Sequence, residues 1–408
     1  MMHRRTLLAA GLSLALAAAC HQDELFTPLV PAYTGGALFQ RYVSMGNSIA
    51  MGIQSGGIDD SSQRVAYPVL VAAVMGGNSF YYPSLAEPGC PPRYTNVFTG
   101  ARVGGGTSTT CAFRSNPLPP YVSNVAVTDA HVLDLLQNGP GAGTHSNGLT
   151  QIVLGGRTQV QAMRAAHPTF VTLWIGDNDV LGAVLTVNSG DSTLITPTAS
   201  FQSDYRKVMD SIKAAGAKGL LIGVQNVTAI PYLSSGQTYF AIKNTPPSPF
   251  PTNFAVGPNC APRALGGQGD SVLVPFPFGL ALIGQAQANP STTVTLACTE
   301  VQTVQPAEFA KLAATVTAYN AYILAQAKAD SADFGFWDVN PTLDSVRAVP
   351  GQVAPFPNTS VACTGSPLGL AFSCDGVHPS TAAHRLIAKK VVQTINAWFG
   401  TAIPAITP

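Results

Sequence analysis

The stretch RYVSMGNSIAMG at residues 41–52 decides the fold that the sequence predicts. Residues 42–45 have the pattern of a short buried strand, Gly46-Asn47-Ser48 that of a sharp turn, and residues 49–52 that of a helix start. A serine at such a junction lies at the carboxyl edge of a parallel sheet, where ligands of open α/β sheets bind. Backbone N–H groups at a helix start also favour a developing negative charge. Ser48 is therefore a candidate nucleophile, with a simple helix cap as the alternative.

Strand and helix patterns alternate along the rest of the chain. The apolar run TFVTLWI is typical of a central parallel strand. Strands are expected at residues 42–45, 122–127, 169–175, 219–225 and 334–339, and the longer helices at 65–77, 158–166, 200–215 (capped by Ser200), 306–328 and 380–398. This alternation predicts an α/β fold, a three-layer α/β/α sandwich around a parallel five-stranded sheet with long loop insertions. The expected loops are residues 83–120, 226–305 and 341–374.

Two further motifs can complete a site with Ser48. Gly176-Asp177-Asn178-Asp179 directly follows the central strand, and Asp375-Gly376-Val377-His378 precedes the last helix. An Asp three residues before a His can hold the imidazole in one tautomer and leave its far nitrogen free as a base. A serine hydroxyl needs such a base to become a nucleophile, and the carboxamide of Asn178 can donate to an oxyanion. Taken singly, these motifs can also be an Asx turn and an ordinary turn before a helix.

The order of these three motifs resembles that of the SGNH (GDSL-type) hydrolase superfamily. The resemblance extends from Tyr42 to Trp398 and implies a flavodoxin-like sandwich and an esterase, lipase or related acyl hydrolase without a cofactor. The roles that it implies are Ser48 as nucleophile, His378 as base, Asp375 as its orienting partner, and Asn178 with the Ser48 N–H as oxyanion donors. It also implies motif positions of structural importance, which are Gly46, Asn47, Gly176 and Asp179.

The chain departs from the family pattern in two places. Asn47 stands where the family usually has Asp, which keeps the shape of the side chain and loses its charge. The family also has a glycine whose N–H joins the oxyanion hole. The best match is in residues 124–130 (NVAVTDA), with Asp129 at the place of that glycine, and Gly89 and residues 104–106 are alternatives.

Composition excludes several other function classes. The chain has 408 residues, of which 46% are hydrophobic and 10% charged, and a formal net charge of +1. It can therefore fill a core but has no basic patch or charge run for nucleic acid. Metal-ligand spacings for zinc or calcium are absent, so no metal is expected. The remaining histidines of the predicted domain are expected at the surface or in structural roles, with the last on the solvent side of its helix: His131, His145, His167 and His384.

The N-terminus predicts export. A basic segment at residues 3–5 precedes an apolar segment at 7–19 that is too short to span a bilayer. The sequence Ala17-Ala18-Ala19-Cys20 resembles a bacterial lipoprotein signal, which implies cleavage before Cys20 and a lipid on its sulfur; an ordinary signal peptide is the alternative. We thus expect a periplasmic or cell-surface monomer anchored to the membrane. Its parts would be a signal peptide (1–19), a tether (20–40) and one domain (41–400) with an insertion at about 227–304.

The other six cysteines predict disulfides, because they are even in number and an exported protein meets an oxidising compartment. Sequence alone does not fix their connectivity. The simplest scheme pairs sequence neighbours around three loops rich in Gly, Pro and Ser, which gives Cys90–Cys111, Cys260–Cys298 and Cys363–Cys374.

The leading hypothesis is a serine esterase or lipase that cleaves carboxylic esters through an acyl-enzyme. The alternative is a non-catalytic surface lipoprotein that binds glycan or polymer on the same scaffold, and the departures at Asn47 and Asp129 motivate it. The sequence leaves the ester substrate open. Residues 275–280 (PFPFGL) can line an acyl pocket or lid, or form a satellite core beneath a disulfide-bonded loop.

Overall fold

The structure is a computed structural model that describes residues 35–77, 79–112, 119–139 and 144–407. The predicted signal peptide, Cys20 and most of the predicted tether lie outside these residues. A parallel sheet forms the centre, with strands in the order β1 (Tyr42–Gly46), β4 (Phe170–Trp174), β5 (Lys218–Ile222) and β10 (Phe334–Trp337). Every residue of β1 and β4 is buried, as expected for strands covered on both faces.

The expected fifth strand at residues 122–127 is not a strand. The segment runs parallel to β1, and the Val125 and Val127 N–H groups donate to the Ser44 and Gly46 carbonyls. The N–H groups of Ser123 and Asn124, however, both donate to the Tyr81 carbonyl. The Gly46 N–H, which would continue the ladder to the Val125 carbonyl, donates to the side chain of Gln159. The ladder is therefore reduced to one isolated bridge, and the sheet has four strands rather than five.

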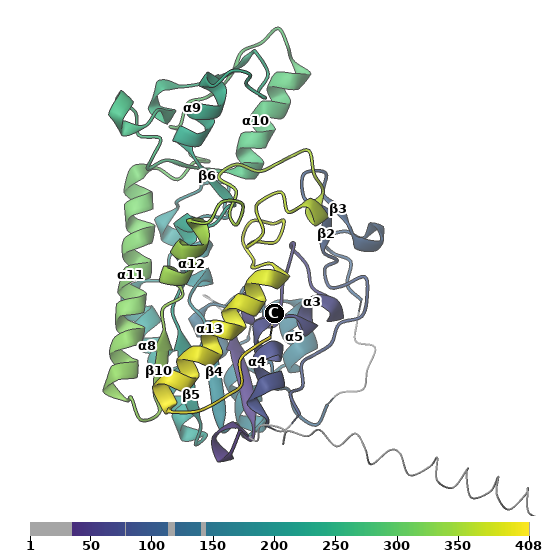
Figure 1. The fold of residues 1–408 in the computed structure, drawn as a ribbon, viewed down its shortest axis with the longest axis vertical. Coiled ribbons are helices and arrows are strands. Elements are labelled where there is room, and N and C mark those ends of the chain that lie inside the picture. Colours follow the sequence, from purple (N-terminus) through teal and green to yellow (C-terminus); the bar gives the residue numbers. More distant parts are fainter. Residues whose placement is uncertain (1–34, 78, 113–118, 140–143, 408) are drawn as a thin grey trace, which may run out of the picture. The chain divides into compact units, whose positions relative to one another are not determined.

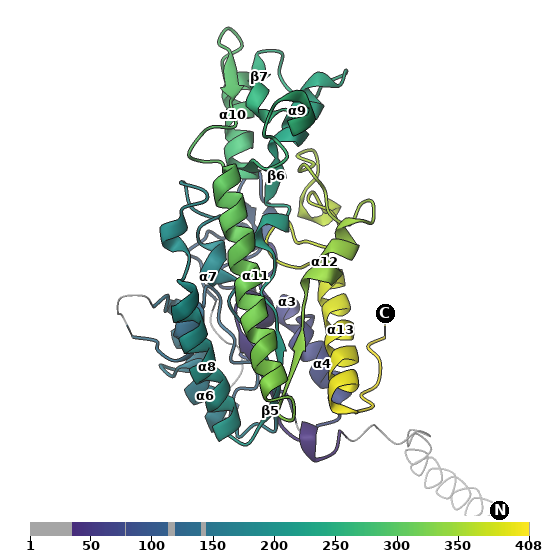
Figure 2. The same cartoon turned by 90° about the vertical axis from the view of Figure 1, so that its left-hand side faces the viewer.

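Helices cover both faces of the sheet, which gives the predicted three layers (Figures 1 and 2). Helices α4 (Tyr67–Met75) and α13 (Thr381–Phe399) pack together on one face. Helices α6 (Gln159–Ala165), α8 (Thr198–Ala214) and α11 (Pro306–Ala329) cover the other. No helix among the described residues is long and apolar enough to cross a membrane.

Two details of these helices differ from expectation. The N-cap of α8 is Pro197, so Ser200 lies inside the helix and does not cap it. His384 of α13 is fully buried, not solvent-facing. Its Nδ1 accepts a 3.3 Å hydrogen bond from the Tyr67 N–H at the start of α4, because this turn of α13 packs against that helix.

The segment expected to be irregular between residues 226 and 305 folds into a small unit with its own apolar core. It contains helices α9 (Gly236–Asn244) and α10 (Phe276–Ala288) and two pairs of short strands, which are β6 (Leu233–Ser235) with β8 (Leu273–Pro275) and β7 (Phe254–Val256) with β9 (Val294–Leu296). The Cys260–Cys298 disulfide lies in its core. The PFPFGL stretch leads into α10, and Phe276 is buried there.

The other two expected loops also contain regular structure. Residues 83–120 include the hairpin of β2 (Tyr94–Asn96) and β3 (Ala101–Arg102), and residues 341–374 include most of α12 (Asn340–Arg347). The remaining short helices are α2 (Ser48–Met51), α3 (Asp60–Arg64), α5 (Gly148–Leu154) and α7 (Asn178–Leu181). Disulfides join Cys90 to Cys111, Cys260 to Cys298 and Cys363 to Cys374, the pairing of sequence neighbours.

Candidate active site

Ser48 lies where β1 ends and the short helix α2 begins, at the carboxyl edge of the sheet. Gly46 allows the chain to turn there, because its φ is +148° and an added Cβ would lie 2.1 Å from the Trp174 carbonyl oxygen. The side chain of Gln159 on α6 binds both the N–H and the C=O of Gly46. Asn47 caps α2 by accepting the Ile49 N–H, so Ser48 is not the cap. Among the described residues, the Ser48 hydroxyl has no hydrogen-bond partner.

Asn47 is paired with a buried carboxylate. Its Nδ2 lies 2.6 Å from Oδ2 of Asp177, and the other oxygen of Asp177 accepts the Gln225 N–H at 2.7 Å. Burial raises the pKa of Asp177 to about 6, although these two hydrogen bonds oppose the shift. Asn47 thus contacts a carboxyl group across the turn, that of Asp177.

Asp375 and His378 form a local pair within one turn. Nδ1 of His378 lies 2.9 Å from Oδ2 of Asp375, and a carboxylate can only accept, so the proton is on Nδ1 and Nε2 is left without one. The other oxygen of Asp375 accepts the backbone N–H groups of Val377 and His378. Burial raises the pKa of Asp375, but His378 and these N–H groups outweigh burial and lower it to about 2.

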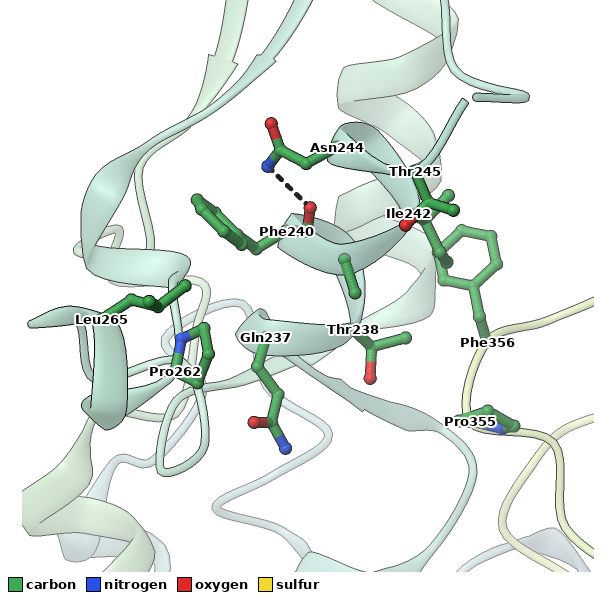
Figure 3. Close-up of a pocket in the computed structure, with 11 residues that line it drawn as sticks. Gln237, Thr238, Phe240, Ile242, Asn244, Thr245, Pro262, Leu265, Pro355 and Phe356 are labelled. Carbon is green, nitrogen blue, oxygen red and sulfur yellow. Dashed lines mark hydrogen bonds between the residues drawn. The ribbon is translucent and has the colours of Figure 1, made fainter. Parts of the chain in front are cut away.

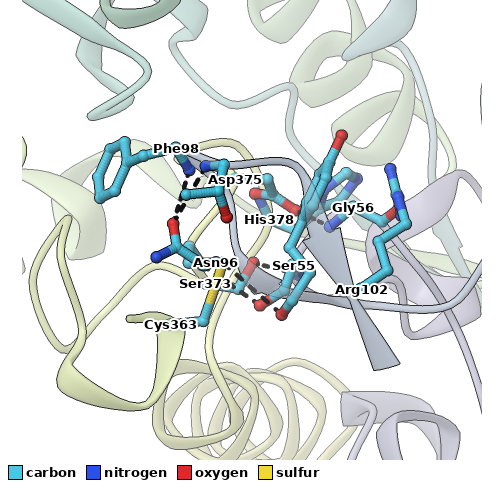
Figure 4. The surroundings of a disulfide bond; sticks show 12 residues. Ser55, Gly56, Asn96, Phe98, Arg102, Cys363, Ser373, Asp375 and His378 are labelled. Carbon is cyan, nitrogen blue, oxygen red and sulfur yellow. Dashed lines mark hydrogen bonds and ion pairs between the residues drawn. A yellow bond between two sulfur atoms is a disulfide. The ribbon is translucent and has the colours of Figure 1, made fainter. Parts of the chain in front are cut away.

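A residue that the sequence did not indicate completes the environment of Asp375. The Gly56 N–H donates to Oδ2 of Asp375 at 2.6 Å (Figure 4). Gly56 has a φ of +61°, and an added Cβ would lie 2.5 Å from the ring of Tyr94. Arg102 lies over that ring at 3.7 Å and donates to the Gly56 carbonyl at 2.9 Å. The Cys363–Cys374 disulfide lies directly before Asp375 in the chain, so the carboxylate is held from two sides.

Asn178 begins helix α7, and its Nδ2 donates to the Ala130 carbonyl at 2.9 Å. Asp129 therefore lies near Asn178, and its φ of +62° is the conformation that a glycine adopts most readily. The Asp129 carboxylate is exposed and receives hydrogen bonds from Thr128 and Asn147. This geometry fits a backbone role for position 129, although Asp129 is not among the described residues that line the pocket at Ser48.

A hydrogen bond to Asp179 connects the segment after Asp129 to the Gly-Asp-Asn-Asp motif. It is fully buried, its Oδ2 accepts the Val132 N–H at 3.0 Å, and burial raises its pKa to about 7. His131 stacks on His145 with ring centroids 3.6 Å apart, and burial lowers the pKa of His131 to about 3. Asp179 thus fixes the position of the chain that follows Asp129.

Ser48, Asn178 and His378 line one small pocket of about 20 Å³, together with Asn47, Asp177 and Gln225. The apolar part of its wall consists of Ile49, Leu181, Val227, Ile230 and Val377. Sequence reasoning did not identify Gln225 as a site residue. Its position three residues after the end of β5, at the same sheet edge as Ser48, was the available signal.

A larger cavity of about 540 Å³ lies elsewhere, on the insertion (Figure 3). It is lined by residues of α9, by Pro262 and Leu265, and by Pro355 and Phe356, none of which borders the pocket at Ser48. Within the described part of the chain, no group of three His, Cys, Asp or Glu side chains could hold a metal ion.

Residues 42–391 match the family GDSL-like Lipase/Acylhydrolase. The chain belongs to this family. Its fold is the mixed α/β fold of the SGNH hydrolases, with a central parallel sheet between helices, and the family places the protein among the hydrolases of esters.

Solved structures of similar proteins include TesA, an acetylxylan esterase and an extracellular lipase. TesA is 14% identical over 88% of this chain and 99% of its own, with a TM-score of 0.35. A catalytic mutant of the acetylxylan esterase Axe2 from Geobacillus stearothermophilus is 11% identical over 89% and 96%, with a TM-score of 0.39. The extracellular lipase of Streptomyces rimosus is 14% identical over 88% and 99%, with a TM-score of 0.36. No curated relative matches the chain.

Proposed function

We propose that the protein is a serine esterase that works through an acyl-enzyme, with Ser48 as nucleophile. The observation that carries the proposal is that Ser48, Asn178 and His378 line one pocket while Asp375 holds Nδ1 of His378. Nε2 of His378 takes the proton of the Ser48 hydroxyl as its oxygen attacks the ester carbonyl carbon. Asp375, whose pKa is lowered to about 2, stays ionised and stabilises the imidazolium.

The negative charge on the carbonyl oxygen is stabilised by the Ser48 N–H and by Nδ2 of Asn178. One hydrogen of that amide binds the Ala130 carbonyl, which leaves the second for the oxyanion. The N–H of Asp129 is a third candidate donor. His378 then returns its proton to the departing alcohol oxygen, and a water activated by the same imidazole hydrolyses the acyl-enzyme.

The test compares wild type and Ser48→Ala in the hydrolysis of p-nitrophenyl acetate and in labelling by a fluorophosphonate. We expect wild type to hydrolyse the ester and to be labelled at Ser48, and the variant to lose roughly 10³-fold or more in kcat and all labelling. Ser192→Ala, an exposed serine outside the pocket, is the control and should match wild type. Equal rates in wild type and Ser48→Ala would end the proposal in favour of a non-catalytic binding protein.

We further propose that the enzyme is exported and anchored by a lipid on Cys20, and that it acts as a monomer. The basic and apolar segments before Cys20 and the three disulfides support export to an oxidising compartment.

A further inference from the structure

Gln225 borders two cavities at once. One is the pocket of about 20 Å³ that contains Ser48 and His378. The other is an almost entirely apolar cavity of about 50 Å³ between β4, α12 and α13, lined by Trp174, Leu343, Phe372 and Ile387 among others. Among the described residues, Gln225 is the one that both linings share.

The side chain of Gln225 is not held by a hydrogen bond. The residue is 9% exposed, and its side chain makes no hydrogen bond to any described residue. Its amide atoms are not among the fully buried side-chain atoms that lack a partner, so the amide faces the open space of the pocket. The position of Gln225 is set instead by its backbone, whose N–H donates to Asp177 at 2.7 Å. The side chain can therefore form part of the pocket wall. Replacing it leaves the hydrogen bond between the Gln225 N–H and Asp177 in place.

The size of the pocket limits what can be attached to Ser48. A cavity of roughly 10–15 Å³ holds one water molecule, so the pocket at Ser48 has space for one or two groups of that size. A methyl group is of that size, and a longer alkyl chain is not. If the apolar cavity beyond Gln225 were joined to this pocket, the combined space would suit a longer acyl chain, because an apolar lining accommodates methylene groups.

We propose that Gln225 determines acyl-chain length: its side chain closes the catalytic pocket off from the apolar cavity and restricts the enzyme to esters of acetyl-sized acyl groups. This inference rests on the proposed esterase function. It identifies the substrate class as short-chain carboxylic esters and assigns the selectivity to one side chain.

The experiment measures kcat/KM for p-nitrophenyl acetate, butyrate and octanoate with wild type, Gln225→Ala and Gln225→Met. A methylene group changes discrimination in an apolar pocket by roughly 10-fold or more, so wild type should prefer acetate over octanoate by at least about tenfold. Gln225→Ala should lower the acetate-to-octanoate ratio by at least about tenfold, chiefly by raising kcat/KM for octanoate. Gln225→Met keeps the length of the wall without the amide, and its ratio should stay within about threefold of wild type.

A wild type that prefers octanoate overturns the inference, as does a ratio in Gln225→Ala equal to that of wild type. A shift in Gln225→Met as large as in Gln225→Ala also overturns it, because polarity rather than size would then be responsible. If Gln225→Ala does not fold, Gln225→Asn shortens the wall by one methylene and gives the same readout. Failure of the proposed function looks different, since no ester would be hydrolysed and Ser48 would not be labelled.

Discussion

The pair of Asn47 and Asp177 explains why the chain can lack the usual acid beside its proposed nucleophile. The two side chains are 1% and 5% exposed and share a 2.6 Å hydrogen bond. Two carboxylates at this distance could not both ionise. An amide at position 47 can therefore bind the carboxylate at position 177 without adding a second negative charge.

Asn47→Asp should destabilise the protein by about 3 kcal/mol at pH 8, because it buries a second carboxylate beside Asp177 without a counter-charge. The loss should shrink at pH 5, since the pKa of Asp177 is raised to about 6 and one proton can then be shared by the pair. Chemical denaturation at the two pH values measures both effects. Adding Asp177→Asn should recover stability at pH 8, and an Asn47→Asp protein as stable as wild type there would contradict the account.

Gly56 lies far from Asp375 in the sequence, but its backbone N–H contacts the proposed pair of Asp375 and His378. Gly56→Ala brings a Cβ within 2.5 Å of Tyr94 and should displace the N–H from Asp375. We expect kcat for p-nitrophenyl acetate to fall about tenfold with KM little changed, because the substitution disturbs the orientation of His378 but not the contacts with substrate. Gly100→Ala is the matched control: its φ of +72° imposes the same backbone strain, but its Cβ meets nothing within 4 Å. Equal losses of kcat in both variants would argue against a positioning role.

At the scale of elements, the insertion contacts the turn that contains Asp375 and His378. The Tyr232 N–H, just before β6, donates to the Gly376 carbonyl at 2.9 Å. An added Cβ at Gly376 would lie 2.8 Å from that nitrogen. The two backbones can therefore approach this closely only because residue 376 is a glycine. The rings of Tyr232, Phe276 and Phe98 then connect this contact to α10 and to the hairpin of β2 and β3.

The contact between α4 and α13 depends on a neutral histidine. Burial, and to a lesser degree His378, lowers the pKa of His384 to about 3. A histidine with a lowered pKa contributes stability that is fully present above its unfolded pKa of about 6.5 and is lost as the pH falls toward the folded value.

His384→Gln keeps an acceptor for the Tyr67 N–H but cannot take up a proton. We expect the free energy of unfolding of wild type to fall more steeply than that of the variant between about pH 6.5 and 3, by up to about 1.4 kcal/mol per pH unit. Urea denaturation across this range provides the measurement. His167→Gln, at an exposed position, should retain the wild-type slope, and parallel curves for wild type and His384→Gln would refute the role of His384.

At the scale of the whole molecule, the three layers bring the three motifs to one edge of the sheet. Motifs that follow β1 and β4 meet there because both strands run in the same direction, and the turn before α13 reaches the same edge.

The proposed lipid anchor gives a prediction for the whole chain in the cell. Cys20→Ser should release the protein from the membrane fraction and abolish incorporation of labelled palmitate, because the lipid would be attached to the Cys20 sulfur. Esterase activity of the purified variant should equal that of wild type, since the proposed site lies within residues 46–378. Unchanged membrane association and labelling in Cys20→Ser would contradict the anchor.

The sequence by itself was sufficient for whatever depends on neighbours in the chain. The apolar runs at β1, β4, β5 and β10 predicted the parallel sheet, because burial on both faces requires continuous hydrophobic residues. The spacing of Asp375 and His378 predicted their hydrogen bond, since three residues in a turn bring the two side chains together. The prediction of the fifth strand was wrong because the competing acceptors, the Tyr81 carbonyl and the Gln159 side chain, are distant in sequence.

Only the tertiary structure decided contacts between residues far apart in the chain. Gly56 and Asp375 are 319 residues apart, and Asn47 and Asp177 are 130 apart, so no local pattern links either pair. The burial of His384 depends on where α4 packs. The place of Gln225 between two cavities likewise depends on helices from the end of the chain. Sequence determined which chemical groups the protein has, and packing determined their charge, their partners and the space left for a substrate.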